Sequence, residues 1–389
     1  FQSIIKSHNK EKYDIHGFST RAANDQLSNE IKNYFGNFHN ISSKSAIEAA
    51  KTIYEQKIDV LIDLAGHTKN NSLEILAFRP APVQAHYLGY GSTIGSDNID
   101  WLITDNVHTP IELYKFCSES LILLPNSFMS AEYLKIKNIN VSRKNENLPQ
   151  KSIVFANFNS TSKFDPKSFK CWMKILKNVP KSVLWLKQTS DLTEKNLVKE
   201  AEMLGIAANR LIFAERKSRI EHIARLGLAD ICFDTFLHNG GVTTIDALNA
   251  GVPVISLKGT NHTERTGASI LSAAGLHECI KINESEYTKF CIDLGLQKPM
   301  INELKKKIKD IVPKSALFDN HLISKNLESS YEKMFKYWKN NNKPEFIQKI
   351  FDETLRLTDQ LINDHLLCLP SASFTECFTE ANNYLQPLC

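Results

Sequence analysis

A group of small and polar residues interrupts an apolar stretch at residues 228–257, which read LADICFDTFLHNGGVTTIDALNAGVPVISL. The group consists of Gly240, Gly241, Thr243, Thr244 and Asp246. Glycine has no Cβ, so the backbone can approach a ligand closely here, and a helix capped by Thr243 or Thr244 would offer free N–H groups and a positive dipole end to a phosphate. Asp246 lies one turn further on and could accept hydrogen bonds from a ribose. The pattern predicts a nucleotide diphosphate site, but a glycine turn before a capped helix would need the same residues.

Two further groups could contact a nucleotide. Ser218 and Glu221 form a capping-box pattern, so a helix is expected to begin there. His222 and Arg225 then share one helix face, where an imidazole could stack on a base and a guanidinium could reach the base edge or the phosphates. Lys163 follows the strand-like run SIVFAN and could contact a departing phosphate. Taken alone, each of these side chains could equally lie on a solvated surface.

The composition argues against several classes of protein. A formal net charge of +4, with no basic run interleaved with aromatics, gives no support for nucleic-acid binding. The eight cysteines are scattered without a CxxC pair, which argues against disulfides and zinc and favours the reducing cytoplasm. No uninterrupted apolar run reaches the roughly 18 residues of a membrane span. Neither a G-x-G-x-x-G dinucleotide motif after a first strand nor a P-loop is present, and no metal or other cofactor is expected.

The elements that must position these residues alternate along the chain. Short apolar runs and amphipathic segments take turns, as in parallel α/β units, and 389 residues suffice for two domains. Strands are expected at 58–66, 82–90, 100–105, 152–157, 182–188, 210–215, 230–236 and 252–257, and helices at 167–179 and 218–229. The polar segment 141–151 lacks periodicity and is expected to link the domains. Residues 346–370 have the pattern of an amphipathic helix, and no pattern is evident after them.

Several long motifs occur together in one order. They include DLAGHTKNN at 63–71, RPAPVQAHYLGYGSTIG at 79–95, FANFNSTSKFDP at 155–166, the run from 210 to 259 and ERTGASILSAAGL at 264–276. On these motifs the chain resembles the catalytic region of the O-linked N-acetylglucosamine transferase family, especially its bacterial and Spindly-type members, and the resemblance covers roughly residues 1–345.

This resemblance implies a fold and an activity. The fold would be α/β of the GT-B type, with two Rossmann-like domains whose parallel sheets face a cleft. Residues 1–145 would form the N-terminal domain on the acceptor side, truncated at its start, and 151–345 the nucleotide-sugar domain, with a tail of unknown role at 346–389. The activity would be metal-independent, inverting transfer of a sugar, N-acetylglucosamine in the first instance, from a UDP-sugar to Ser/Thr hydroxyls of a protein or peptide acceptor.

The resemblance also implies roles for particular residues. His222 would pack against the uracil, Arg225 would help to hold the nucleotide, and Asp246 would bind the ribose. The diphosphate would be cradled by Gly240, Gly241, Thr243 and Thr244, while Lys163 would offset the charge of the departing nucleotide. The remaining donor contacts would come from Asn159, Leu88, Gly89 and Lys69. His67 is the local candidate for acid–base help, with a structural histidine as the alternative.

The chain departs from the family pattern at several positions. Ser160 stands in place of a glutamine, Gly91 and Ser92 replace a Pro-Gly pair, and Gly241 replaces a histidine of the animal enzymes. A family histidine discussed as a catalytic base would lie just before Phe1, and tetratricopeptide repeats are expected upstream in the full-length protein. The alternatives are a different donor and acceptor, such as UDP-glucose to asparagine or GDP-fucose to hydroxyls, or a truncated nucleotide-binding paralogue without turnover.

Overall fold

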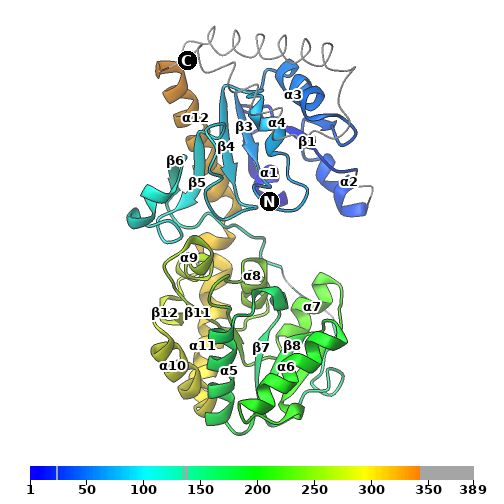
Figure 1. Ribbon diagram of the computed structural model, residues 1–389, viewed down its shortest axis with the longest axis vertical. Coiled ribbons are helices and arrows are strands. Elements are labelled where there is room, and N and C mark those ends of the chain that lie inside the picture. Colours follow the sequence, from blue (N-terminus) through cyan, green and yellow to red (C-terminus); the bar gives the residue numbers. More distant parts are fainter. Residues whose placement is uncertain (23–24, 135, 137–138, 342–389) are drawn as a thin grey trace, which may run out of the picture.

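Two lobes, each built on parallel strands, make up the computed structural model, which describes residues 1–22, 25–134, 136 and 139–341 (Figure 1). The arrangement confirms the expected α/β class and its parallel sheets. None of the helices in these ranges is long and apolar enough to cross a membrane. The tail predicted at 346–389 lies outside the described residues.

The second lobe carries a six-stranded sheet in the order β12-β11-β10-β7-β8-β9. Its strands are β7 Ile153–Asn157, β8 Ser182–Lys187, β9 Leu211–Ala214, β10 Ile231–Phe233, β11 Val254–Leu257 and β12 Ile280–Lys281. All neighbours pair in parallel. The chain builds outward from β7 to β9, then restarts at β10 on the other side of β7. In such a sheet, ligands bind beyond the carboxyl ends of the two strands where the order reverses, here β7 and β10.

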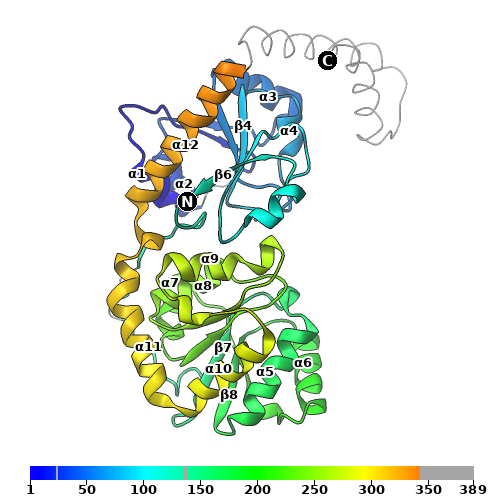
Figure 2. The same cartoon turned by 90° about the vertical axis from the view of Figure 1, so that its left-hand side faces the viewer.

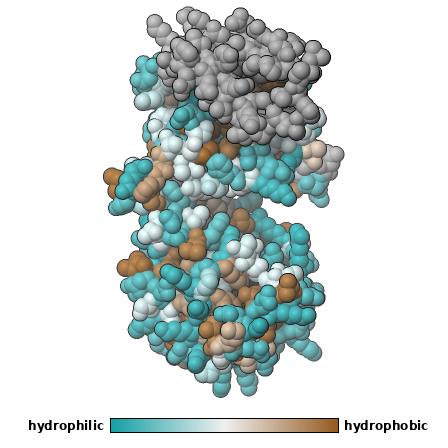
Figure 3. Space-filling model, in the orientation of Figure 1, coloured by the Kyte–Doolittle hydropathy of each residue, from teal (hydrophilic) through white to brown (hydrophobic). Residues whose placement is uncertain are grey.

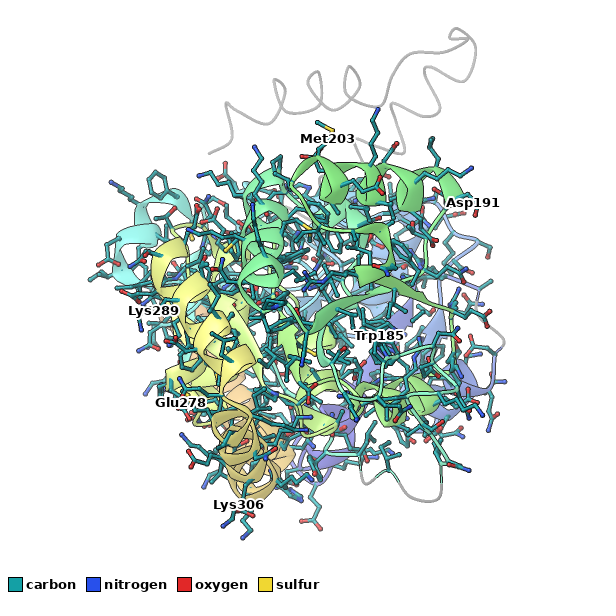
Figure 4. All side chains as sticks on the ribbon, turned by 90° about the horizontal axis from the view of Figure 1, so that it is seen from below. Trp185, Asp191, Met203, Glu278, Lys289 and Lys306 are labelled. Carbon is teal, nitrogen blue, oxygen red and sulfur yellow. The ribbon has the colours of Figure 1, made fainter. Side chains whose placement is uncertain are left out.

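Helices cover both faces of this sheet (Figure 1). They are α5 Pro166–Asn178, α6 Asp191–Met203, α7 Arg219–Leu226, α8 Val242–Asn249, α9 Thr266–Ala273, α10 Glu284–Leu296 and α11 Lys298–Ile311. The start of α7 is fixed by the predicted capping box of Ser218 and Glu221. The core of the lobe includes fully buried Trp172 and Trp185. Figure 4 shows Trp185 inside the lobe, whereas Met203 projects at its edge.

The first lobe carries a four-stranded sheet and a separate strand pair. The sheet runs β3-β4-β5-β6, with β3 Val60–Asp63, β4 Val83–Tyr87, β5 Trp101–Asp105 and β6 Ser120–Leu124. The pair consists of β1 His16–Ser19 and β2 Asn37–Asn40, and the helices are α1 Gln2–Ser7, α2 Gln26–Lys32, α3 Ala46–Glu55 and α4 Leu73–Ala77. The expected strands are all present, though shorter than predicted. The sequence analysis missed β1, β2, β6 and β12.

The last described helix, α12 Asn320–Asn341, crosses back to the first lobe (Figure 2). Its Leu327 and Met334 are fully buried in one hydrophobic cluster with Val83 and Ala85 of β4. Ser324 Oγ also donates to the carbonyl of Ile4 at 3.0 Å. The sequence analysis placed residues up to 345 in the second domain, whereas this packing assigns α12 to the first. The reason is that an amphipathic helix does not show in its sequence which sheet it covers.

The lobes touch through the carboxyl ends of their strands, the loops that follow, and the first turn of α9. Ser269 Oγ donates to Asp105 Oδ2 at 2.6 Å, and Arg265 Nε donates to the carbonyl of Val107 at 2.7 Å. Ser92 Oγ and His262 Nδ1 are 3.2 Å apart. The space-filling view shows a constriction between the two lobes (Figure 3). The loops after β4 and β5 therefore face the loop after β11, so the carboxyl ends of both sheets point toward the boundary between the lobes.

Candidate functional site

The glycine-rich corner joins β10 to α8 at the switch point of the second sheet. Gly240 N donates to Asp234 Oδ1 at 2.7 Å, and a Cβ on Gly240 would lie only 2.4 Å from Thr243 Oγ1. Only glycine fits there without displacing its neighbours. A small cavity adjoins the corner, lined among others by Phe158, Asn159 and Thr243.

The helix start differs from the prediction. Gly241 is the N-cap of α8, and no side chain among the described residues caps it. Thr243 Oγ1 instead donates to Asn159 Oδ1 at 2.6 Å, and Thr244 Oγ1 donates to the carbonyl of Gly240 at 2.9 Å. The prediction that a threonine caps this helix is therefore wrong, because both threonines lie inside the first turn. Without a capping side chain, the first amides of α8 remain available to an anion.

Lys163 lies at the same corner. It ends the short 3₁₀ helix Thr161–Lys163 that follows β7, and its Nζ donates to the carbonyl of Asn239 at 3.1 Å. Burial lowers the pKa of Lys163, while the charge of Asp234 acts in the opposite direction. In the part of the chain that the structure describes, this ammonium has no salt bridge. The structure thus brings Lys163, Asn159, Gly240 and Thr243 together from two segments that are distant in the sequence.

Asp234 is a buried acid that the sequence analysis did not single out. It follows β10 directly and is fully buried. Its Oδ1 accepts hydrogen bonds from the amides of Thr235 at 2.9 Å and Gly240 at 2.7 Å, and its Oδ2 accepts one from Ser256 Oγ at 2.7 Å. Burial raises the pKa of Asp234 to about 6, although these hydrogen bonds and the charge of Lys163 oppose the rise. An acid at the end of an apolar strand was the available signal.

Asp246 already has a charged partner. Arg219 Nη2 and Nε lie 2.9 Å and 3.3 Å from Asp246 Oδ1, and the Asp246 side chain is buried. Burial raises the pKa of Asp246, and Arg219 partly offsets that rise. The carboxylate stands one turn into α8 as the sequence indicated, but a ribose would share it with Arg219, which the sequence analysis did not consider.

His222 and Arg225 contact each other on α7. Arg225 Nε donates to His222 Nδ1 at 3.3 Å, and the His222 ring packs edge-on against Phe158 with ring centroids 4.6 Å apart. Arg225 is only 2% exposed and forms a salt bridge with Glu146 at 3.2 Å. The predicted shared face is confirmed, but the guanidinium of Arg225 faces Glu146 and His222 in the interior. Its predicted direct contact with the nucleotide stays a prediction.

The first lobe contributes two loops at the ends of β3 and β4. Leu88 has a positive φ of 74° in a turn where Gly89 N donates to the carbonyl of Tyr87 at 3.0 Å. Such a backbone is rare and strained for a bulky residue, and strain of this kind gathers at functional sites. A Cβ on Gly89 would lie 1.8 Å from the carbonyl oxygen of Leu64, so this loop requires glycine where it crosses its neighbour.

His67 and Lys69 lie on the loop after β3 and are both exposed. His67 Nε2 donates to the carbonyl of Ile94 at 2.7 Å, so the ring ties this loop to the loop after β4. On β4, His86 Nδ1 lies 2.7 Å from Asp63 Oδ2 and His86 Nε2 lies 2.6 Å from the carbonyl of Tyr90. The contact of His67 favours the structural alternative for this residue over acid–base chemistry.

Comparisons with known proteins identify a family and several relatives of this chain. The model of glycosyl transferase family 41 matches residues 1–138 and 130–327. A probable UDP-N-acetylglucosamine–peptide N-acetylglucosaminyltransferase SEC from Arabidopsis thaliana is 35% identical over 342 residues, which are 86% of this chain and 35% of that protein. The corresponding SPINDLY protein of Solanum lycopersicum is 30% identical over 351 residues, or 88% of this chain and 38% of its own. The chain thus spans little more than a third of these relatives.

Solved structures show the same fold. A mutant O-GlcNAc transferase from Thermobaculum terrenum superposes with a TM-score of 0.80 at 24% identity, covering 87% of this chain and 65% of its own. Sucrose-phosphate synthase from Thermosynechococcus elongatus superposes with a TM-score of 0.57 at 14% identity, covering 86% and 92%. These similarities confirm the expected GT-B fold. The family-model matches, which together span residues 1–327, and the two relatives show that the chain belongs to glycosyl transferase family 41.

Proposed function

We propose that this chain is the catalytic region of a glycosyltransferase that moves N-acetylglucosamine from UDP to Ser/Thr hydroxyls of proteins. The observation that carries the proposal is the convergence of Lys163 with the uncapped start of α8 at the switch point. The names of the relatives, which are 35% and 30% identical to this chain, support both the donor and the peptide acceptor.

The proposed reaction is a single displacement with inversion. An acceptor oxygen attacks the anomeric carbon, the bond from that carbon to the UDP oxygen breaks, and the acceptor proton passes to a base. Negative charge builds on the departing UDP. The ammonium of Lys163 and the first amides of α8 supply positive potential where that charge forms, so the proposed reaction needs no metal ion. His222 would lie against the uracil and Asp246 would accept from the ribose.

The acceptor and the setting belong to the same proposal. The acceptor is a protein or peptide, bound on the side of the first lobe with the help of tetratricopeptide repeats in the longer protein. Neither a nucleic acid nor a membrane takes part. A cytoplasmic setting is supported by the described cysteines, all of which are free thiols: Cys117, Cys171, Cys232, Cys279 and Cys291.

Calorimetry with UDP, GDP, UDP-glucose and UDP-N-acetylglucosamine tests the donor. Tight binding of UDP and its N-acetylglucosamine conjugate is expected, with weaker binding to Lys163→Ala. Release of UDP on adding a peptide acceptor then separates an enzyme from a binding protein. Preference for GDP, or binding of UDP without any release, would favour the alternatives. Failure of every nucleotide to bind would refute the proposed site.

A further inference from the structure

The segment at residues 141–151, which links the two lobes, is held against the second lobe by hydrogen bonds and a salt bridge. Arg143 Nη1 donates to the carbonyl of Ser152 at 2.8 Å, and Arg143 Nη2 lies 2.8 Å from Asp230 Oδ2. Leu148 is buried, and its amide donates to the carbonyl of Arg143 at 2.7 Å. Glu146 stands between these anchors, so its position is defined by the backbone on either side.

Glu146 forms two salt bridges with residues near the start of α7 and within it. Its Oε2 lies 3.2 Å from Arg225 Nη1 and its Oε1 lies 3.0 Å from Lys217 Nζ. The side chains of Glu146 and Arg225 are 6% and 3% exposed, whereas that of Lys217 is 38% exposed. Removing one member of a buried pair leaves the other charge uncompensated. Arg225 therefore depends on Glu146 to remain inside, where it lies over the ring of Phe158 at 5.4 Å.

Arg225 in turn defines the state of His222. Because Arg225 Nε donates to His222 Nδ1, that nitrogen must carry a lone pair, and the ring proton resides on Nε2. Burial and the charges of Arg225 and Lys187 lower the pKa of His222 to about 4, so the ring is neutral at pH 7. The ring rests edge-on against Phe158 at the end of β7, which sets its tilt.

We propose that Glu146 is a positioning residue for the base-binding histidine: it holds Arg225, and Arg225 sets the orientation and tautomer of His222. The inference rests on the proposed function, in which the nucleotide base lies against His222. A neutral ring of fixed orientation suits stacking on an uncharged base, because a mobile imidazole would lose conformational freedom on binding. The segment between the lobes thereby contributes to recognition of the base without touching it.

The first test replaces Glu146 by glutamine. Glu146→Gln keeps the shape but removes the charge, so Arg225 is expected to turn toward water and release His222. UDP affinity should fall roughly three- to tenfold, the range of one net hydrogen bond, while inorganic pyrophosphate binds as before. Lys217→Ala is the matched control, because it removes the other partner of Glu146 without touching Arg225. It should leave UDP affinity unchanged.

The second readout is the imidazole itself. Nitrogen NMR of the full chain should show His222 with its proton on Nε2 and no titration between pH 5 and 8. In Glu146→Gln the ring should titrate nearer the ordinary value of about 6.5. Arg225→Lys, which keeps a charge beside Glu146 but lacks the Nε donor, should release the tautomer in the same way if Glu146→Gln fails to fold.

The outcomes separate the two levels of inference. An Nδ1-protonated His222 in the unaltered protein, or unchanged tautomer and UDP affinity in both variants, would overturn the role of Glu146. Equal losses of UDP and pyrophosphate binding would also overturn it, because they would indicate general damage. If the unaltered protein binds no UDP at all, the proposed function fails, while the NMR experiment still decides whether Glu146 controls His222.

Discussion

Replacing Asp234 by asparagine should stabilise the protein while weakening its nucleotide site. The pKa of Asp234 is raised from 3.8 to about 6 by burial, so the charged form is disfavoured in the folded state. The contribution of Asp234 to the free energy of unfolding therefore decreases as the pH rises from about 4 through about 6. Above that pH the ionised carboxylate destabilises the fold by its full amount. The pKa difference of about 2 corresponds to on the order of 3 kcal/mol.

Asparagine can keep most of the local hydrogen bonds. Its Oδ1 can accept from the amides of Thr235 and Gly240, and its Nδ2 can donate to Ser256 Oγ once that hydroxyl turns round. The charge that helps to keep Lys163 protonated is lost, however, because Asp234 acts to raise the pKa of that lysine. UDP affinity should therefore fall and decline further as the pH rises.

The assay is urea denaturation of both proteins at pH 4.5 and pH 8, with calorimetric UDP titrations alongside. The gain of Asp234→Asn over the unaltered protein should be small at the lower pH and approach its limit of about 3 kcal/mol at the higher one. Ser256→Ala is the control, because it removes a hydrogen bond to the carboxylate and should lower stability at pH 8. A stability difference that stays the same at both pH values would refute the reasoning, since it would show that Asp234 is not a costly buried charge.

Three further substitutions test the corner. Lys163→Ala should lower turnover by about 10²-fold or more, the scale of losing one charge-stabilising donor, and near-normal turnover would remove Lys163 from the mechanism. Gly240→Ala should destabilise by about 1–3 kcal/mol in denaturation experiments, since its Cβ would meet Thr243 Oγ1 at 2.4 Å. Arg219→Ala should cost no more than about 1 kcal/mol, because its side chain is half exposed, yet should raise the pKa of Asp246. UDP affinity of that last variant should gain a pH dependence, and a flat profile would contradict the role of Asp246.

Local sequence patterns were enough to predict most of the strands and helices of the fold. The runs that became β7, β8 and β11 are apolar and buried on both faces, so they stand out as short strands. The strands β1 and β2 read HGFS and NFHN, which lack that signal, and β12 is two residues long. The capping box at Ser218 and the glycines before α8 were visible for the same reason, since each is a contact over a few residues.

Contacts between residues that are distant in the sequence could not be predicted in the same way. The partner of Arg225 is Glu146, 79 residues away, and the partner of Lys163 is the carbonyl of Asn239, 76 residues away. No periodicity marks such pairs, because each depends on how the sheet orders its strands. The crossing of α12 to the first lobe is another example, since the helix follows the second lobe in the sequence yet packs on β4 of the first.

The sequence by itself determined the α/β class, the glycine corner and the segments that could supply a lysine, a histidine and an aspartate to it. The tertiary structure alone decided which of those charges face a ligand and which face one another. Burial makes an unpaired charge costly, so Arg225 pairs with Glu146 inside. Lys163 instead lies half-buried in the 3₁₀ helix after β7, without a salt bridge among the described residues. Only the folded arrangement of the strands sets that burial.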